Sequence, residues 1–246
     1  MSSSVMDNLD SVTFVSLAAV IMILNSAYLL SLRALSPHTP TGLRVLFVWH
    51  AFDFLIHLIF EGSFLYNCFF TSSPYDAAVH SPALITNFLS APDRLYGAAY
   101  GDNWATKLWM VYAQADKRWA GADITVVSLE LLTVLGGGPL AFYICTGIAR
   151  RDYRVAFWMV VLATAELYGG FMTFAPEWLT GNQNLDTSNF MFKWVYLVFF
   201  NMLWVVLPLY ALWYSFRDIS NAFAVRNGVM KARLRMEEEA KEAKKA

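Results

Sequence analysis

The sequence predicts an all-α integral membrane protein: a bundle of five transmembrane helices with a long lumenal connection that contains an amphipathic interfacial helix. Of the 246 residues, 57% are hydrophobic and only 15% are charged, whereas a soluble domain usually carries about 25% charged residues. Five segments are long and apolar enough to cross a bilayer, which takes about 20 residues of helix. The basic residues also divide unequally between the two sides that five spans create.

The five predicted spans define a membrane domain over residues 1–216, and they cover about 12–32, 46–66, 124–146, 155–175 and 192–216. If the N-terminus lies outside, the connections 33–45 and 147–154 and the tail 217–246 are cytoplasmic. They hold two, three and eight of the 18 Lys and Arg residues, as the positive-inside rule requires. No basic residue precedes the first span, and the run is long enough to cross, so we expect it to be a retained helix rather than a cleaved signal.

The connection 67–123 is too long for an ordinary loop and should have structure of its own. Pro74, Pro82 and Pro92 break its first half. Apolar and charged residues alternate at helical spacing over 103–119, which predicts an amphipathic helix on the membrane surface, acting as a lid over the bundle. The tail 217–246 is rich in Glu, Lys and Ala and is expected to be a solvated cytoplasmic helix or a disordered end.

The second span contains four ionisable residues. At roughly 100° per residue, His50, Asp53, His57 and Glu61 fall at about 0°, 300°, 340° and 20° around the helix. A charge at the bilayer centre costs about 2.5–3.5 kcal/mol, so this stripe should face other helices, where an ionisable cluster is a candidate functional site. Alternatively, Asp53 or His50 lies near the cytoplasmic interface and is simply hydrated.

Three other spans carry a polar pair at mid-depth: Glu130 with Thr133, Glu166 with Tyr168, and Asn201 with Trp204. A lone Asn or Thr often serves only as a hydrogen bond between helices, and Glu166 could be a protonated structural acid. Residues 136–139 (GGGP) and Pro208 are expected to interrupt the third and fifth spans, which would allow close packing or widen a cavity.

These residue types suit one kind of chemistry. Desolvation in an apolar cavity favours the neutral form of a carboxyl group, and such an acid can donate a proton to an alkene where water is absent. Trp204 offers the π system that stabilises the resulting cation. A second carboxylate or His57 could then remove a proton from a neighbouring carbon. Together these steps isomerise a double bond.

The run Ile56–Gly62 (IHLIFEG) resembles the second-helix motif of the emopamil-binding proteins, the sterol Δ8–Δ7 isomerases of the endoplasmic reticulum. Further blocks agree in order and spacing: 129–133 (LELLT), 138–140 (GPL), 167–169 (LYG) and 200–208 (FNMLWVVLP), with a loop-like match at 108–118. The resemblance covers about 44–216. It implies the five-helix fold and an endoplasmic-reticulum location.

By this resemblance, the catalytic residues are His57, Glu61, Glu130 and Trp204. Glu61 with His57 would deliver the proton, Glu130 would balance the cation and Trp204 would stack on it. The division of proton transfer between the two glutamates stays open.

The residues expected to contact the substrate are Asp53, Thr133, Tyr168 and Asn201, with Asn201 and Thr133 also orienting the acids. Two departures from the family pattern leave the substrate open: the 67–123 connection is longer than expected, and Gly170 stands where the animal-type pattern has an acidic residue.

Three function classes follow. The first is a membrane isomerase for a sterol-like substrate, with a terpene-cyclase-like enzyme that protonates an epoxide or alkene of a prenylated natural product as its alternative. The second is a non-catalytic sterol- or lipid-binding protein, which the complete acid set disfavours. The third is a metal enzyme using the second-span stripe, which four histidines in all make hard to assemble. We therefore expect no cofactor and no metal. The expected partners are a hydrophobic sterol or isoprenoid and the lipid bilayer; the net charge of −1 gives no reason to expect nucleic acid, and a homodimer is left open.

Overall fold

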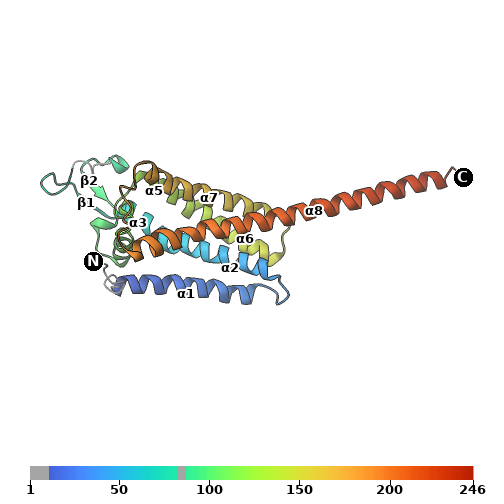
Figure 1. Ribbon diagram of the computed structural model, residues 1–246, viewed down its shortest axis with the longest axis horizontal. Coiled ribbons are helices and arrows are strands. Elements are labelled where there is room, and N and C mark those ends of the chain that lie inside the picture. Colours follow the sequence, from blue (N-terminus) through green and yellow to red (C-terminus); the bar gives the residue numbers. More distant parts are fainter. Residues whose placement is uncertain (1–10, 82–86, 246) are drawn as a thin grey trace.

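Five long helical segments packed side by side make up the molecule (Figure 1). The structure is a computed structural model that describes residues 11–81 and 87–245. Within these residues, five segments are long and apolar enough to cross a membrane: Ser11–Ala34, Thr41–Phe70, Ile124–Arg150, Val155–Leu179 and Met191–Ala243. The predicted all-α bundle of five spans is confirmed.

Three of the five segments change helix type along their length. The first and fourth are the single helices α1 (Ser11–Ala34) and α7 (Val155–Leu179). The second consists of α2 (Thr41–Ile56), the π-helix η2 (His57–Glu61) and α3 (Gly62–Phe70). The third consists of α5 (Ile124–Leu132), the π-helix η7 (Thr133–Gly137) and α6 (Gly138–Arg150). The fifth consists of the π-helix η8 (Met191–Phe200) and α8 (Asn201–Ala243).

The third span is interrupted near the predicted glycines, where the π-helix η7 separates α5 from α6, but the interruption expected at Pro208 in the fifth span is wrong. Pro139 lies in the first turn of α6, directly after η7, where a wider turn accommodates a missing backbone N–H. Pro208 lies inside α8 with its ring buried. Close packing does occur: a Cβ on Gly137 would lie 3.7 Å from the His57 ring, and one on Gly138 would lie 3.4 Å from the His57 Cβ. The third segment thus lies close to His57, and a Cβ at either glycine would make an ordinary van der Waals contact with it.

Helix α2 lies at the centre of the main core. It packs against α1, α6 and α8, and Leu46 and Phe47 on it are almost completely buried. Gly42 marks the closest approach of α2 to α8, since a Cβ there would lie 2.7 Å from the Tyr210 hydroxyl. This central position gives α2 and η2 contact with most of the bundle and places their polar side chains inside it.

The long connection has structure, as expected, but not the structure expected. It contains two short antiparallel strands, β1 (Ser72–Pro74) and β2 (Arg94–Tyr96), paired with Ser72 opposite Tyr96. It also holds the short 3-10 helices η4 (Phe88–Ser90) and η5 (Ala98–Tyr100). Pro82 lies outside the described residues.

The helix predicted over 103–119 is too long. Helix α4 (Trp104–Tyr112) starts at Asn103, whose side chain caps the Thr106 N–H at 3.0 Å, and a turn follows it before the 3-10 helix η6 (Lys117–Trp119). Asp116 ends the helical pattern, because its backbone is extended and its Oδ1 accepts the Arg118 N–H. Helix α4 crosses the end of the bundle and packs against α1 and α3, so its position over the bundle agrees with a lid.

A buried group of charges fastens this connection to the end of α7. Arg118 Nη2 lies 2.6 Å from Asp116 Oδ2, and Arg118 Nη1 donates to the Thr173 carbonyl at 2.7 Å. Arg118 Nε lies 3.6 Å from Glu177 Oε1, which in turn accepts a hydrogen bond of 2.7 Å from Asn184 Nδ2. The three charged side chains are at most 5% exposed. We call this group, Asp116, Arg118 and Glu177, the clamp.

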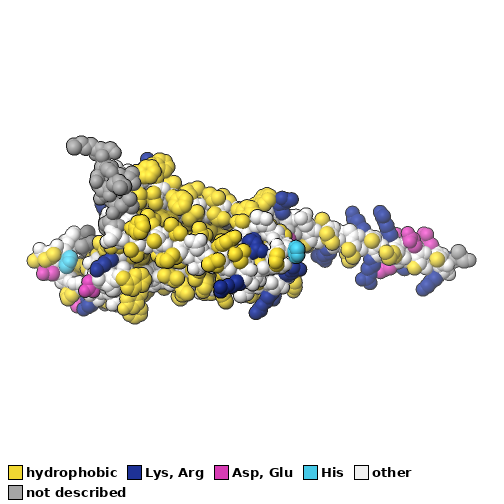
Figure 2. All heavy atoms as spheres, turned by 90° about the horizontal axis from the view of Figure 1, so that it is seen from below, with side chains coloured by type: hydrophobic (Ala, Val, Ile, Leu, Met, Phe, Trp, Pro, Cys, Tyr) yellow, Lys and Arg dark blue, Asp and Glu magenta, His cyan; other side chains and the backbone are white. Residues whose placement is uncertain are grey.

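Helix α8 runs far beyond the bundle without a break (Figure 1). The backbone therefore shows no boundary at residues 216 and 217, and a boundary there remains a prediction about the bilayer. The helix continues because residues 217–227 contain neither Gly nor Pro. Figure 2 shows Lys and Arg side chains gathered around the end of the bundle from which α8 leaves and along the protruding part.

Candidate functional site

A cavity of about 880 Å³ lies inside the bundle. This volume is within the range of roughly 300–1,000 Å³ that is usual for small-molecule sites. Its walls come from α1, α2, η2, α4, α5, η7, α7, η8 and α8 and are mainly apolar and aromatic. The titratable side chains on the walls include His57, Glu61, Glu130 and Glu166.

His57 is the central residue in a series of polar contacts in this cavity. Its Nδ1 lies 2.6 Å from Glu61 Oε2, four residues later in the sequence. Its Nε2 lies 2.9 Å from Asp53 Oδ1, four residues earlier, an ionic contact without the alignment of a hydrogen bond. Trp204 Nε1 donates to the same Asp53 oxygen at 2.8 Å. One imidazole thus joins two carboxyl groups, and one of these carboxyl groups holds the indole.

The π-helix η2 begins at His57 and ends at Glu61. Single π-helical turns are frequent at functional sites because they re-aim side chains within an otherwise regular helix. Here the π-helical turn runs from His57 to Glu61, the two residues that form the shortest contact in this series of polar contacts. His57, Asp53 and their spacing were predicted from the helical stripe, whereas this local widening was not.

Two further carboxyl groups reach the cavity from other helices. Glu130 on α5 interacts with Glu61, and its Oε2 is buried with no hydrogen-bond partner among the described residues. Glu166 on α7 approaches Asp53 and His57, with donor atoms of the three groups all within 4.8 Å of one another. Four carboxyl groups around one imidazole cannot all be ionised in an apolar cavity, so some of them carry protons that can be transferred.

Trp204 is surrounded by other rings. Its ring centroid lies 5.4 Å from that of Trp49 in an edge-on arrangement, and 6.1 and 6.2 Å from those of Phe52 and His57. The hydrogen bond to Asp53 fixes the indole from its other end. The orientation of Trp204 is therefore set before any ligand enters.

The structure brings seven of the eight predicted site residues to the cavity wall: His57, Glu61, Glu130, Thr133, Tyr168, Asn201 and Trp204. Asp53 is not on the wall. It is completely buried behind His57 and Trp204, so it holds other site residues rather than facing a ligand. His50 also lies away from the cavity wall, with its Nδ1 2.7 Å from the Leu46 carbonyl, and it is buried rather than hydrated.

Asn201 and Thr133 make hydrogen bonds that do not reach the acids. Asn201 Nδ2 donates to the carbonyls of Tyr196 and Leu197, both at 3.0 Å, and more weakly to the Tyr112 hydroxyl at 3.4 Å. Thr133 Oγ1 donates to a carbonyl of its own helix at 2.9 Å. The expectation that these two residues orient the acids has no contact to support it among the described residues.

Sequence reasoning missed the aromatic roof of the cavity. Trp109 and Trp119 stack at 4.8 Å, and Tyr112 meets Trp119 edge-on at 5.4 Å. Burial raises the pKa of Tyr112 above its usual value, while the Asn201 hydrogen bond acts in the opposite direction. The phenol therefore stays neutral at physiological pH. The concentration of aromatic residues over 104–119 was the signal that could have identified this roof.

Asp53, His57 and Glu166 are also the described residues with the spacing of a metal site. Two of their donor atoms already have partners, since Asp53 Oδ1 accepts the Trp204 N–H and His57 Nδ1 contacts Glu61. The expectation of no metal remains a prediction.

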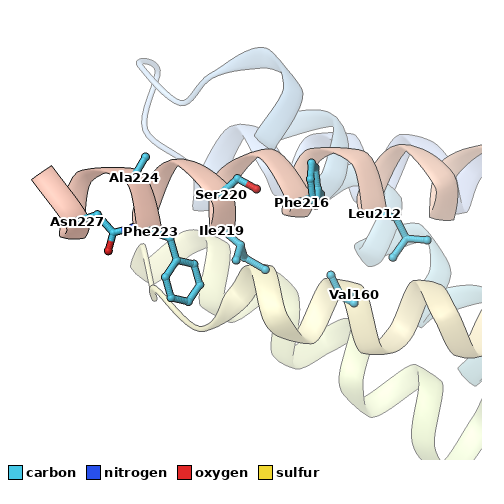
Figure 3. A pocket seen from close by; sticks show the side chains of 8 residues that line it. All are labelled: Val160, Leu212, Phe216, Ile219, Ser220, Phe223, Ala224 and Asn227. Carbon is cyan, nitrogen blue, oxygen red and sulfur yellow. The ribbon is translucent and has the colours of Figure 1, made fainter.

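A second hollow lies between α7 and α8, where α8 leaves the bundle (Figure 3). Leu212, Ile219 and Phe223 point from α8 towards Val160 on α7. This groove is lined by no titratable side chain, so it cannot carry out the acid–base chemistry that the cavity offers.

Comparison with known proteins finds a family that part of this chain resembles. Residues 104–215 match the family model of the EXPERA domain, the expanded EBP superfamily. The matched part contains Glu130, Asn201 and Trp204, whereas His57 and Glu61 precede it.

Full-length relatives extend the likeness. A 3-beta-hydroxysteroid-Delta(8),Delta(7)-isomerase of Mus musculus is 29% identical over 182 residues, which is 74% of this chain and 67% of the relative. A probable isomerase of the same name from Oryza sativa is 27% identical over 84% of this chain and 81% of its own length. A protoglabretal synthase of Citrus sinensis is 25% identical over 68% of this chain and 65% of its own length.

The matched family, the named relatives and five membrane-crossing helices agree with one another. The chain is a multi-pass membrane protein, and its residues 104–215 are similar to the EXPERA family, the expanded EBP superfamily.

Proposed function

We propose that this protein is a membrane isomerase that protonates a C=C bond of a sterol-like substrate and removes a proton elsewhere, as in the conversion of a Δ8- into a Δ7-sterol. The observation that carries the proposal is the buried chain from Glu61 through His57 and Asp53 to Trp204, on the wall of a large apolar cavity. The names of the relatives agree with this chemistry.

The reaction needs one proton in and one proton out. Moving a double bond from C8=C9 to C7=C8 requires protonation at C9, a cation at C8 and loss of a proton from C7. Glu61, resupplied by His57 at 2.6 Å, delivers the first proton. Glu130 balances the positive charge from the neighbouring helix, and the face of Trp204 stabilises the cation.

The cavity also protects the intermediate. A carbocation reacts with water, so the apolar lining and the aromatic roof of α4 and η6 serve to exclude water during turnover. Thr133, Tyr168 and Asn201 lie on the wall and contact the substrate. The long connection above them acts as the lid.

The runner-up function is a cyclase that protonates an epoxide or alkene of a prenylated natural product. Relatives named protoglabretal synthase and isomeliandiol synthase favour it, and so does the open space beside Gly169 and Gly170, where an added Cβ would meet nothing within 4 Å. The same acid and aromatic groups would start either reaction. A binding protein without catalysis would have no use for four carboxyl groups around one imidazole.

Lipid profiles test the function directly. Cells with and without the gene are extracted and compared by mass spectrometry, with a Glu61→Gln strain as the inactive control. Accumulation of Δ8-sterols in both the deletion and the control strain supports the isomerase. An unchanged sterol profile with a missing isoprenoid product supports the cyclase, and no difference in either class of compound refutes both.

We also propose that the protein resides in the endoplasmic reticulum with its N-terminus in the lumen and residues 217–246 in the cytosol. The basic end of the bundle in Figure 2 supports this orientation. A cysteine at Ser73 should react with an impermeant label only from the lumenal side, and one at Ser220 only from the cytosolic side. Labelling of both cysteines from the same side would show that the fifth predicted span does not cross the membrane. Association into a homodimer remains a prediction, which cross-linking in the membrane can test.

A further inference from the structure

Glu166 is an acid that the chemistry above does not use. It lies on α7 and lines the cavity. Both of its carboxyl oxygens are buried and meet no N–H or hydroxyl donor among the described residues; the polar group beside them is the buried carboxyl of Asp53. Buried acids are usually satisfied by donor groups. A carboxyl group on a cavity wall whose polar neighbour is a second carboxyl group can exchange a proton with a ligand.

The neighbours of Glu166 place it at one end of the polar chain. Donor atoms of Glu166, Asp53 and His57 all lie within 4.8 Å of one another. Asp53 accepts the hydrogen bond from Trp204, and Glu166 lies next to Asp53, so Glu166 belongs to the Trp204 end of these contacts. Glu130 occupies the corresponding place on the other side, next to Glu61. The cavity thus contains two carboxyl pairs, Glu61 with Glu130 and Asp53 with Glu166, joined by one imidazole.

We propose that Glu166 is a further catalytic residue, the base that takes the proton from the cationic intermediate. This assignment rests on the proposed function and completes it, because it separates the site of proton delivery from the site of proton removal. Two carboxyl groups at such short range share one proton, since two like charges cannot both persist there. The Asp53–Glu166 pair becomes neutral when it accepts a proton, and the Glu61–Glu130 pair, doubly charged once it has donated, takes a proton back from His57.

The protons balance over one turnover. The Glu61–Glu130 pair gives its proton to C9, and protonated His57 restores that proton to the pair and becomes neutral. The C7–H bond of the cation then breaks, its electron pair forms the C7=C8 bond, and the proton passes to Glu166. The Asp53–Glu166 pair now holds two protons and returns one to His57, which regenerates the starting state. No oxidant, metal or other reactant is needed.

A purely structural role does not account for Glu166. A structural acid would accept hydrogen bonds from donor groups, as Glu177 does from Asn184 at the end of the same helix, whereas Glu166 meets another carboxyl group, that of Asp53. Thr164, two residues from Glu166, shows the ordinary arrangement for a polar group on α7, because its hydroxyl donates to the Val160 carbonyl at 2.7 Å. Thr164 is exposed and lies away from the cavity, so it offers a matched control on the same helix.

The test uses the full-length protein in detergent with 5α-cholest-8-en-3β-ol, unlabelled and deuterated at C7. Glu166→Gln should lower turnover at least ~100-fold, the lower end for loss of an acid–base group, while the affinity for an uncharged sterol analogue stays within ~3-fold. Glu166→Asp keeps the acid but draws it back by one methylene. It should lower turnover by ~10-fold and raise the primary isotope effect at C7, because proton removal then limits the rate. Thr164→Val should behave like the native protein.

The outcomes separate this proposal from the proposed function. Near-native turnover in Glu166→Gln overturns the role of Glu166 and leaves the isomerase intact. The same holds if Glu166→Asp raises the solvent isotope effect but not the C7 effect, since the residue would then deliver the proton. If Glu166→Gln fails to bind the analogue, the C7 isotope effect of Glu166→Asp decides the role of Glu166: a larger effect supports proton removal by Glu166, and an unchanged effect overturns it. If the native protein instead cyclises a prenyl epoxide, the same test uses a substrate deuterated at the carbon that loses the final proton. If it converts neither substrate, both proposals fall.

Discussion

Replacing Trp204 tests whether a cation forms in the cavity. In Trp204→Leu the face of the indole is lost, and a desolvated cation–π contact is worth about 2 kcal/mol, or roughly 30-fold in rate. The hydrogen bond of 2.8 Å to Asp53 is lost as well, and a hydrogen bond to a charged group is worth about 1.5–3 kcal/mol. The expected loss of kcat therefore lies between ~30-fold and ~5,000-fold, depending on how much of the second contribution the transition state senses.

Trp204→Phe separates these two contributions. The phenyl ring keeps a weaker π face but cannot donate to Asp53, so we expect a loss of about 10- to 150-fold in kcat, smaller than in Trp204→Leu. KM should change little in either variant, because a neutral substrate gains no cation–π contact before it is protonated. Trp213→Leu is the matched control: this tryptophan lies on the same helix, half-exposed and outside the cavity.

The assay measures kcat and KM with the Δ8-sterol, and the affinities for an ammonium amphiphile and an uncharged analogue of the same shape. The ammonium imitates the cation, so the native protein should prefer it, and the preference should shrink in Trp204→Leu. Equal affinity of the native protein for the two compounds would refute the cationic mechanism. A rise in KM with unchanged kcat in Trp204→Leu would show that the indole binds substrate and transition state alike.

Four other substitutions test three separate parts of the structure. Glu61→Gln and Glu130→Gln should each lower turnover at least ~100-fold in a folded protein. The control Ser128→Ala should not, because the Ser128 hydroxyl bonds only its own helix. Normal rates in both glutamine variants would show that another residue is the catalytic acid. Gly170→Trp should lower kcat/KM with little change in kcat, because open space beside Gly170 belongs to the cavity wall; a fall in kcat alone would place that space off the entry route. Arg118→Met leaves the two buried carboxylates of the clamp without their cation, at a cost of about 3 kcal/mol. This predicts a thermal midpoint lower by roughly 6–12 °C. An unchanged midpoint would show that the clamp does not hold the lid.

Much of the membrane bundle could be read from the sequence because hydrophobic length is a local property. The five predicted spans correspond to the five helical segments, with ends that differ by at most about five residues except that the fifth helix continues from 216 to Ala243. The stripe of Asp53, His57 and Glu61 was also accessible, since a spacing of four residues brings side chains together on any helix. His50 belongs to the same stripe by spacing but lies one turn too far away to join the chain of contacts.

Contacts between helices could not be read in the same way. Hydropathy does not fix the rotation of one helix against another, so neither the Trp204–Asp53 hydrogen bond nor the approach of Glu166 was predicted. The length of α4 was missed for a related reason. Asp116 turns the chain because it pairs with Arg118 and forms a bridge with Leu185, a partner far away in the sequence.

The polar chain in the cavity accounts for both the stability and the chemistry of the site. Four acids and a histidine at membrane depth are tolerated only when they neutralise one another through shared protons and hydrogen bonds. Sharing leaves some acids neutral and others ionised, which is the condition that proton transfer in both directions requires. A glutamine at Glu61, Glu130 or Glu166 keeps the shape but removes one transferable proton. We therefore expect such variants to remain folded while losing turnover, and a loss of folding in all three would show that the acids serve the bundle rather than the reaction.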